Sequence, residues 1–161
     1  MIFIAHRGLT NGPDPIKENN INTIEIAIKK GFDVEIDIWV FDNKVYLGHD
    51  KENLLKIDLK YIEENKEVFW IHSKNFQALD FFSKLDSKEE LNYFWHQEDN
   101  YTLTSKNIPW IYPGCEPISE GILVMPEEVM DISKIYNLKI KGVCSDYIEA
   151  IKEKFNFEEN R

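Results

Sequence analysis

Ile2-Phe3-Ile4-Ala5-His6-Arg7-Gly8 is the stretch that sets the expected fold, because a short apolar run ends there in a histidine and a glycine. Three later apolar runs also end in a histidine, at His49, His72 and His96. Short apolar runs of this kind are typical of buried parallel strands, and the ends of such strands carry the active sites of α/β folds. The sequence therefore predicts an α/β protein with polar groups gathered at one end of its sheet.

The rest of the chain alternates expected strands and helices. We expect strands at 2–6, 33–41, 44–48, 67–72, 92–97, 108–112, 121–125 and 140–144. Helices are expected at 58–65, 76–85, 127–136 and 147–155, besides one that starts at Asn22 or Thr23 and ends at Gly31. Residues 44–48 return antiparallel after a turn at Asp42-Asn43.

This alternation favours a parallel sheet with right-handed crossovers, either doubly wound or closed into a barrel. The crossovers at 98–107 and 113–120 are too short for a proper helix. A complete (β/α)8 barrel typically needs about 250 residues. We therefore expect a reduced or distorted TIM-type (β/α) barrel with some helices missing, in a single domain over residues 1–161. A second subunit could close the uncovered wall and form a homo-oligomer.

Composition excludes several classes of partner. The net charge of −10 and the pI near 4.9 would repel a nucleic acid or an anionic membrane surface. We expect no membrane insertion, because the apolar stretches are too short to span a bilayer. Two cysteines, Cys115 and Cys144, are expected to stay reduced, and no basic leader precedes the first strand. These features predict a cytoplasmic protein.

Glu35 and Asp37 lie two residues apart on the strand expected at 33–41, so their side chains point to the same face. Two carboxylates inside a barrel repel each other and lose solvation. A bound divalent cation removes that penalty, and oxygen ligands suit Mg²⁺, Ca²⁺ or Mn²⁺. A solvated strand face is the alternative, and the pattern taken alone fits both interpretations equally well.

Two histidines are candidates for proton transfer. His6 ends the first strand, and the hairpin brings His49 beside the two carboxylates, so that the imidazoles can act as acid and base on one phosphorus. Arg7 can hold phosphate oxygens with paired hydrogen bonds. Lys74 can stabilise charge developing on the phosphorus, with a surface lysine lying over the rim as the alternative.

Later strand ends add further candidates. His72 and Glu98 follow the third and fourth expected parallel strands, and either can complete a metal site. Trp110 and Tyr112 end the strand at 108–112, where they either pack in the interior or line the mouth and bind substrate. Ser145-Asp146 is expected to cap the last helix rather than to touch substrate.

The order and spacing of these motifs resemble the glycerophosphodiester phosphodiesterase family, which belongs to the phosphatidylinositol-phospholipase-C-like barrels. The matching motifs are His6-Arg7-Gly8, Asn22-Thr23, Glu35-x-Asp37, Gly48-His49-Asp50 and the strand end at Lys74. The likeness is tight over residues 2–50, fair over 67–75 and only topological beyond, although Val143-Cys144-Ser145-Asp146 resembles the final strand of the family.

The resemblance implies a divalent-metal phosphodiesterase with two catalytic histidines. By position, His6 and His49 are the acid and base, Glu35 and Asp37 bind the metal, and Arg7 and Lys74 hold the phosphate. Two positions depart from the family pattern. The usual glutamate ligand of the third strand is His72 here, which favours Mn²⁺ or Zn²⁺, unless Glu98 compensates. The Glu-Asn-Thr motif reads Ile21-Asn22-Thr23, unless Glu18 serves through a three-residue insertion.

The expected function is therefore hydrolysis of a small glycerol- or sugar-phosphodiester by a metal-dependent hydrolase, a reaction of lipid metabolism. One alternative is a lyase that releases a cyclic phosphate. Another is a barrel that binds phosphodiesters without turnover, with His72 marking the loss of activity. The sequence leaves open which histidine is the base.

Overall fold

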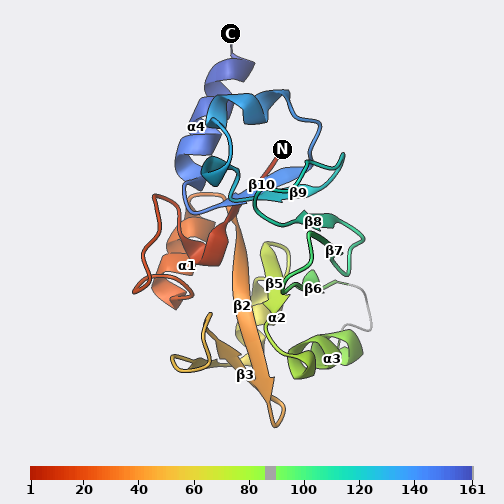
Figure 1. Ribbon diagram of the computed structural model, residues 1–161. Helices are drawn as coiled ribbons and strands as arrows, with labels where there is room; N and C mark the ends of the chain where they lie inside the picture. Colours follow the sequence, from red (N-terminus) through yellow and green to blue (C-terminus); the bar gives the residue numbers. More distant parts are fainter. Residues whose placement is uncertain (86–89, 161) are drawn as a thin grey trace.

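A ten-stranded sheet runs through the chain in the computed structural model, which describes residues 1–85 and 90–160 (Figure 1). Its strands are β1 Ile2–Ala5, β2 Asp33–Phe41, β3 Lys44–Leu47, β4 Leu55–Ile57, β5 Phe69–Ser73, β6 Tyr93–Trp95, β7 Tyr101–Leu103, β8 Pro109–Ile111, β9 Ile122–Val124 and β10 Gly142–Ser145. The α-helices are α1 Ile21–Lys29, α2 Leu59–Glu64, α3 Phe76–Leu85 and α4 Ile148–Glu159. Short 3-10 helices are η1 His6–Gly8, η2 Pro126–Glu128 and η3 Ile132–Asn137.

The long strand β2 organises this sheet. It pairs in parallel with β1 on one side and β5 on the other, and its far half pairs antiparallel with β3. Parallel ladders continue from β1 through β10 and β9 to β8, and from β5 to β6. Antiparallel ladders add β4 to β3 and β7 to β8. The strands β1 and β10 therefore end side by side at Ala5 and Ser145, and β1 and β5 end beside the middle of β2, at Val34 and Ile38.

The prediction of a TIM-type barrel is wrong, because the ladders do not close into a ring. Among residues 1–85 and 90–160, β6 pairs only with β5, and β7 pairs only with β8. The unpredicted strand β7 explains the gap, since it occupies the edge of β8 that β6 would need. Isolated bonds bridge the gap, from the Ser105 N–H to the Tyr93 carbonyl at 2.8 Å and from the Thr102 hydroxyl to the Trp95 carbonyl at 3.0 Å. The result is an open, curved sheet.

Helices cover only part of the outer face. α1 and α3 pack on β2, and α4 packs on β1 and β10. The segments 98–107 and 113–120 contain no helix, as their lengths predicted. The helix expected at 127–136 is also absent, because η2 and η3 take its place. The Asp131 carboxylate accepts the Ser133 N–H at 2.8 Å and starts a new turn there.

Alternation along the strands gives the sheet two different faces. The outer face packs beneath the helices in a core that includes Val34, Ile36 and Ile38 of β2. The inner face carries a smaller apolar cluster, made of Ile4, Trp70, Phe94, Trp110, Ile122, Val124 and Cys144. Two residues further along three of these strands, the inward side chain is a histidine: His6, His72 and His96. A polar layer therefore lies on an apolar floor.

Candidate active site

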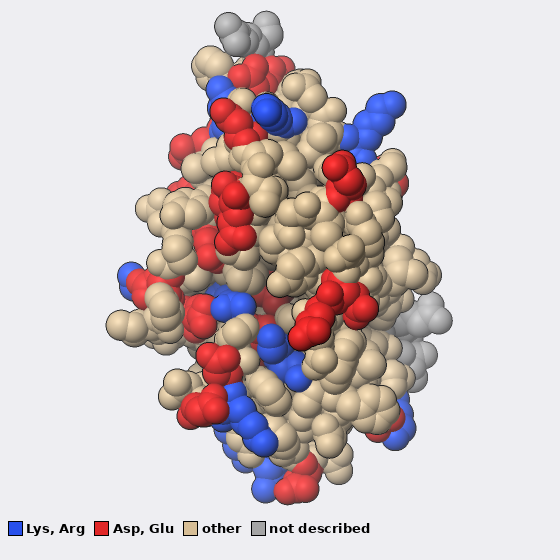
Figure 2. Space-filling view, viewed as in Figure 1, with Lys and Arg blue, Asp and Glu red and all other residues tan. Residues whose placement is uncertain are grey.

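The polar layer opens into a cleft of about 480 Å³. Its lining includes all of the predicted site residues except Asp37, namely His6, Arg7, Glu35, His49, His72, Lys74, Glu98, Trp110 and Tyr112. Figure 2 shows acidic and basic side chains next to each other in the middle of this face of the molecule. A larger groove of about 650 Å³ lies between α3 and the end of β2. There, Asp80 and Lys84 form an ion pair within one turn of α3. The groove therefore does not bring charged side chains from several elements together as the cleft does.

Glu35 and Asp37 point into the polar layer and are almost completely buried, with 2% and 0% of their surfaces exposed. The interpretation of a solvated strand face is therefore wrong. Three cationic side chains surround Asp37: Arg7 Nε at 3.1 Å, His72 Nδ1 at 3.0 Å and Lys74 Nζ at 3.4 Å. Burial raises the pKa of Asp37, but the charges of His72, Lys74 and Arg7 outweigh it and hold that pKa well below its ordinary value.

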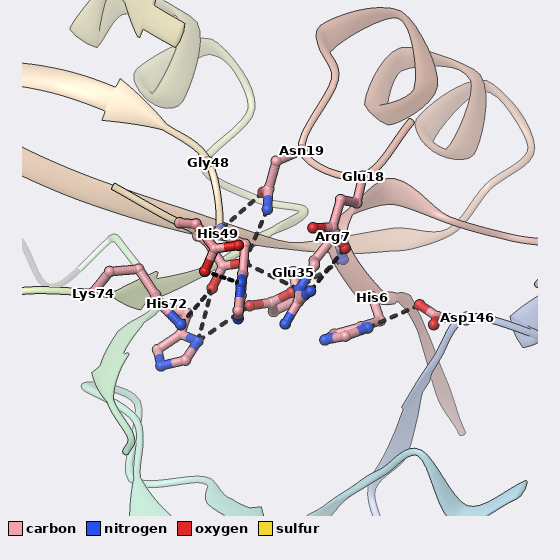
Figure 3. A network of polar contacts seen from close by, with 12 residues as sticks. His6, Arg7, Glu18, Asn19, Glu35, Gly48, His49, His72, Lys74 and Asp146 are labelled. Atoms are coloured by element: carbon pink, nitrogen blue, oxygen red, sulfur yellow. Dashed lines mark hydrogen bonds and ion pairs between the residues drawn. The ribbon is translucent and has the colours of Figure 1, made fainter. Parts of the chain in front are cut away.

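Each carboxylate has one oxygen held by a fixed donor (Figure 3). Glu35 Oε2 accepts the Arg7 main-chain N–H at 3.0 Å, and Asp37 Oδ2 accepts the Asn19 amide N–H at 2.9 Å. The other oxygens face His72, whose Nδ1 lies 3.5 Å from Glu35 Oε1 and 3.0 Å from Asp37 Oδ1. Among the described residues, Asp37 Oδ1 accepts no well-oriented hydrogen bond.

His72 is held in the same manner. Its Nε2 lies 2.7 Å from the His96 carbonyl oxygen, which can only accept, so Nε2 carries a proton. Its ring stacks on Phe94 with centroids 5.0 Å apart. Burial lowers the pKa of His72, but Asp37 and Glu35 outweigh this and raise that pKa to about 9. The second nitrogen, Nδ1, is therefore the one that meets the carboxylates.

Glu35, Asp37 and His72 fit a divalent metal ion. Their candidate ligand atoms all lie within 4.8 Å of one another. Two ligands about 2.1 Å from one ion lie roughly 3.0 Å apart at right angles and roughly 3.4 Å apart in a tetrahedron. The 3.0 Å and 3.5 Å separations from His72 Nδ1 match this range. Glu98 is exposed on the cleft wall and is not a member of the group of three.

His6 is paired with an aspartate that follows the last strand. Its Nδ1 lies 2.8 Å from Asp146 Oδ1, and because an ionised carboxylate only accepts, Nδ1 carries the proton. Nε2 of His6 is then an acceptor on the ring of a residue that lines the cleft. Burial lowers the pKa of His6, but the bond to Asp146 and the charge of Glu35 outweigh it and raise the pKa above 6.5. The prediction that Ser145-Asp146 caps the last helix is wrong, because α4 follows Tyr147 with no side-chain cap. Ser145 Oγ instead accepts the Tyr147 N–H at 2.9 Å, before the helix begins.

The turn after β3 brings His49 to the cleft. The Gly48 N–H donates to the Asp37 carbonyl at 3.0 Å, and the Gly48 carbonyl accepts from the Trp39 indole at 3.0 Å. Gly48 has a φ of 151°, and a Cβ there would lie 2.8 Å from the Asn53 carbonyl oxygen, so only glycine fits. His49 follows directly, with its Nδ1 2.9 Å from Asp50 Oδ1 and about a third of its side chain exposed.

Arg7 holds the acidic groups together. It adopts a left-handed backbone with φ 51°, which is rare outside glycine and directs its N–H to Glu35. Its guanidinium meets Glu18 Oε2 at 2.7 Å as well as Asp37. The side of the Arg7 guanidinium that faces the cleft can bind an anion while the side chain keeps its ion pairs with Glu18 and Asp37. Lys74, with 17% of its side chain exposed, also lies in the cleft rather than over an outer rim.

The loop before α1 distinguishes the two alternatives for the Glu-Asn-Thr motif, which were Ile21-Asn22-Thr23 and an alignment that uses Glu18. Glu18 contacts Arg7 and Asn19 contacts Asp37, whereas Asn22 is exposed on α1 and Thr23 lies within that helix. The alternative with Glu18 is therefore the one that matches the geometry. Sequence reasoning missed Asn19, although an Asn-rich loop next to an expected site is a signal for residues that adopt left-handed backbone.

The two predicted aromatic residues have different environments. Trp110 is 3% exposed, and its ring packs against Phe94 with centroids 4.4 Å apart, so it belongs mainly to the apolar floor. Tyr112 is 44% exposed and meets the His96 ring edge to face at 5.3 Å. Tyr112 is thus the aromatic side chain that a bound molecule can reach more readily.

Comparison with protein-family models and with curated proteins found no match to this chain. In the part of the chain that the structure describes, none of the helices has the length and apolar character needed to cross a membrane. Cys115 and Cys144 are both free thiols. The geometry of the cleft is therefore the basis for assigning a function.

Proposed function

We propose that this protein is a metal-dependent phosphodiesterase that cleaves a small glycerol- or sugar-phosphodiester by histidine acid–base catalysis, as the glycerophosphodiester phosphodiesterase family does. The observation that carries the proposal is the meeting, in one cleft, of two carboxylate-paired histidines with a three-residue ligand group. In Figure 3, His6 and His49 lie on two sides of Glu35. This arrangement offers one imidazole to an attacking oxygen and another to a leaving oxygen.

We assign the general base to His6. The Asp146 carboxylate fixes the tautomer with its proton on Nδ1, leaves Nε2 free to take a proton, and stabilises the imidazolium that forms. The attacking group is either a neighbouring hydroxyl of the substrate or a water molecule. Its oxygen forms a bond to phosphorus while His6 takes its proton.

His49 then has the role of general acid. The Nε2 proton of its imidazolium form passes to the alcohol oxygen as the bond from that oxygen to phosphorus breaks, while Nδ1 stays on Asp50. Attack by a substrate hydroxyl gives a cyclic phosphate, and attack by water gives a monoester. Lys74 and Arg7 supply positive charge where the phosphoryl oxygens gain negative charge.

Glu35, Asp37 and His72 would hold the divalent ion. When bound, such an ion polarises a phosphoryl oxygen and neutralises its developing charge. Arg7 and Asn19 keep the two carboxylates oriented for this task through their hydrogen bonds. The side chains of the cleft therefore form two sets: Glu35, Asp37 and His72 hold the ion, and His6 and His49 transfer protons.

The cleft favours a compact substrate. Its volume of about 480 Å³ accommodates a phosphodiester with a small polar head group. Free thiols and the net charge of −10 support a location in the cytoplasm, away from nucleic acids.

Hydrolysis of bis(p-nitrophenyl) phosphate and of glycerophosphodiesters tests the proposal, measured with Mg²⁺, Ca²⁺, Mn²⁺ or Zn²⁺ in turn. We expect His6→Ala and His49→Ala each to reduce kcat by at least about a hundredfold. Lys60→Ala, an exposed change on α2, is the control for handling and folding. Phosphorus NMR of the products separates a hydrolase from a lyase. Activity that survives in both histidine variants would remove the mechanism, and tight binding without turnover would favour a binding protein.

A further inference from the structure

The imidazole of His72 is immobilised on three sides. Nε2 donates to the His96 main-chain carbonyl at 2.7 Å, and the ring lies almost parallel to Phe94, with an angle of 9° between the planes. Nδ1 faces Glu35 and Asp37. A ring held in this way has little freedom to rotate and exchange its two nitrogens.

A histidine that binds a metal ion through one ring nitrogen commonly donates the N–H of the other to a carbonyl oxygen, which fixes the orientation of the ring. In His72, donation from Nε2 places the lone pair of the neutral ring on Nδ1. The partner here is a main-chain atom of the residue that follows β6, so the orientation is set by the sheet and not by a mobile side chain.

We infer that His72 Nδ1 is a fixed nitrogen ligand that makes this centre selective for Mn²⁺, Co²⁺ or Zn²⁺ over Mg²⁺ and Ca²⁺. This inference rests on the metal site of the proposed function and specifies which class of ion it takes. Imidazole suits transition ions, whereas Mg²⁺ and Ca²⁺ prefer a set of oxygen ligands.

The charge around the ligand group supports the same selectivity. Lys74 Nζ lies 3.4 Å from Asp37 Oδ1, and Arg7 Nε lies 3.1 Å from Asp37 Oδ2. These cations offset part of the negative charge that attracts a hard ion. A bond with more covalent character, from imidazole nitrogen to a transition ion, depends less on that charge.

Calorimetric titration of the metal-free protein with each ion tests the inference directly. We expect Zn²⁺ and Co²⁺ to bind at least about a hundredfold more tightly than Mg²⁺, following the order of divalent affinities. His72→Glu restores an all-oxygen set and should reduce this ratio at least about tenfold. His96→Asn is the matched control, because it removes a cleft imidazole that is not among the three ligand residues and keeps the main-chain carbonyl, so its ratio should stay unchanged.

Nitrogen-15 NMR of histidine-labelled protein gives a second measurement that needs no variant. Zn²⁺ should shift the Nδ1 resonance of one histidine and leave its Nε2 protonated. Equal affinity for Mg²⁺ and Zn²⁺, or ligation through Nε2, would overturn the inference while leaving the proposed reaction in place. Absence of phosphodiester cleavage with every ion would instead overturn the proposed function, since the ion selectivity is measured without substrate.

Discussion

Asn19 provides the sharpest test of how the buried carboxylates are held. It is 6% exposed, its amide N–H donates to Asp37 Oδ2 at 2.9 Å, and its amide oxygen accepts the Asp37 main-chain N–H at 3.0 Å. Asn19→Ala removes both bonds. A hydrogen bond to a charged group contributes about 1.5–3 kcal/mol and a neutral one about 1 kcal/mol, so together they are worth about 3 kcal/mol. Asn19 also has a φ of 50°, and left-handed backbone costs alanine roughly 1–2 kcal/mol more.

A second asparagine separates these two contributions. Asn43 has a φ of 57° in the exposed turn between β2 and β3, so Asn43→Ala carries the backbone strain without the buried bonds. Urea unfolding should give Asn19→Ala a free energy of unfolding about 3 kcal/mol below that of Asn43→Ala, a shift in midpoint of about 1 M or more. Asn22→Ala should lose less than about 0.5 kcal/mol. A difference below about 1 kcal/mol between the first two variants would refute the claim that Asn19 supports Asp37.

Three further predictions concern the reaction. Asp146→Asn weakens the hydrogen bond, and removes the charge, with which Asp146 raises the pKa of His6. The acid limb of the pH profile should therefore move to lower pH while kcat falls at least about a hundredfold, and an unmoved limb would contradict the assignment of His6 as base. Gly48→Ala places a Cβ 2.8 Å from the Asn53 carbonyl oxygen and should lower kcat about tenfold or more by displacing His49. Gly114→Ala is the control, because Gly114 also has a positive φ but a Cβ there would meet only the Val129 side chain, at 3.6 Å. Lys74→Gln should lower kcat about 10- to 1000-fold with a smaller change in KM, as steady-state kinetics on one substrate will show.

The sequence located most strands because their signal is local. Apolar runs ending in histidine predicted β1, β5 and β6 to within a few residues. Closure of the sheet is a different matter, because it depends on how distant segments pair. The three residues of β7 carry too little pattern to be recognised, and yet their ladder with β8 decides that the sheet stays open.

The site was predicted where regular strands deliver side chains and was missed where loops do so. The two-residue period of β2 placed Glu35 and Asp37 on one face, and their burial follows from the inner position of that face. Asn19 reaches the same carboxylates from a loop, through a left-handed backbone that no periodicity describes. Asp146 meets His6 because β10 pairs with β1 in a register that puts Ser145 beside Ala5, a contact 140 residues apart in sequence.

The distribution of charge in the cleft is compatible with the anionic substrate that we propose for this acidic chain. The net charge of −10 belongs to the whole surface, whereas the cleft places Arg7 and Lys74 beside the buried carboxylate of Asp37. Fields inside such a concave site are set by the nearest charges, since solvent ions screen exposed groups beyond about 8–10 Å. Raising the salt concentration should therefore change the association rate of a phosphodiester only slightly, because the buried cations are screened much less than surface charges. A steep loss of kcat/KM with salt would indicate that exposed lysines, and not Arg7 and Lys74, attract the substrate.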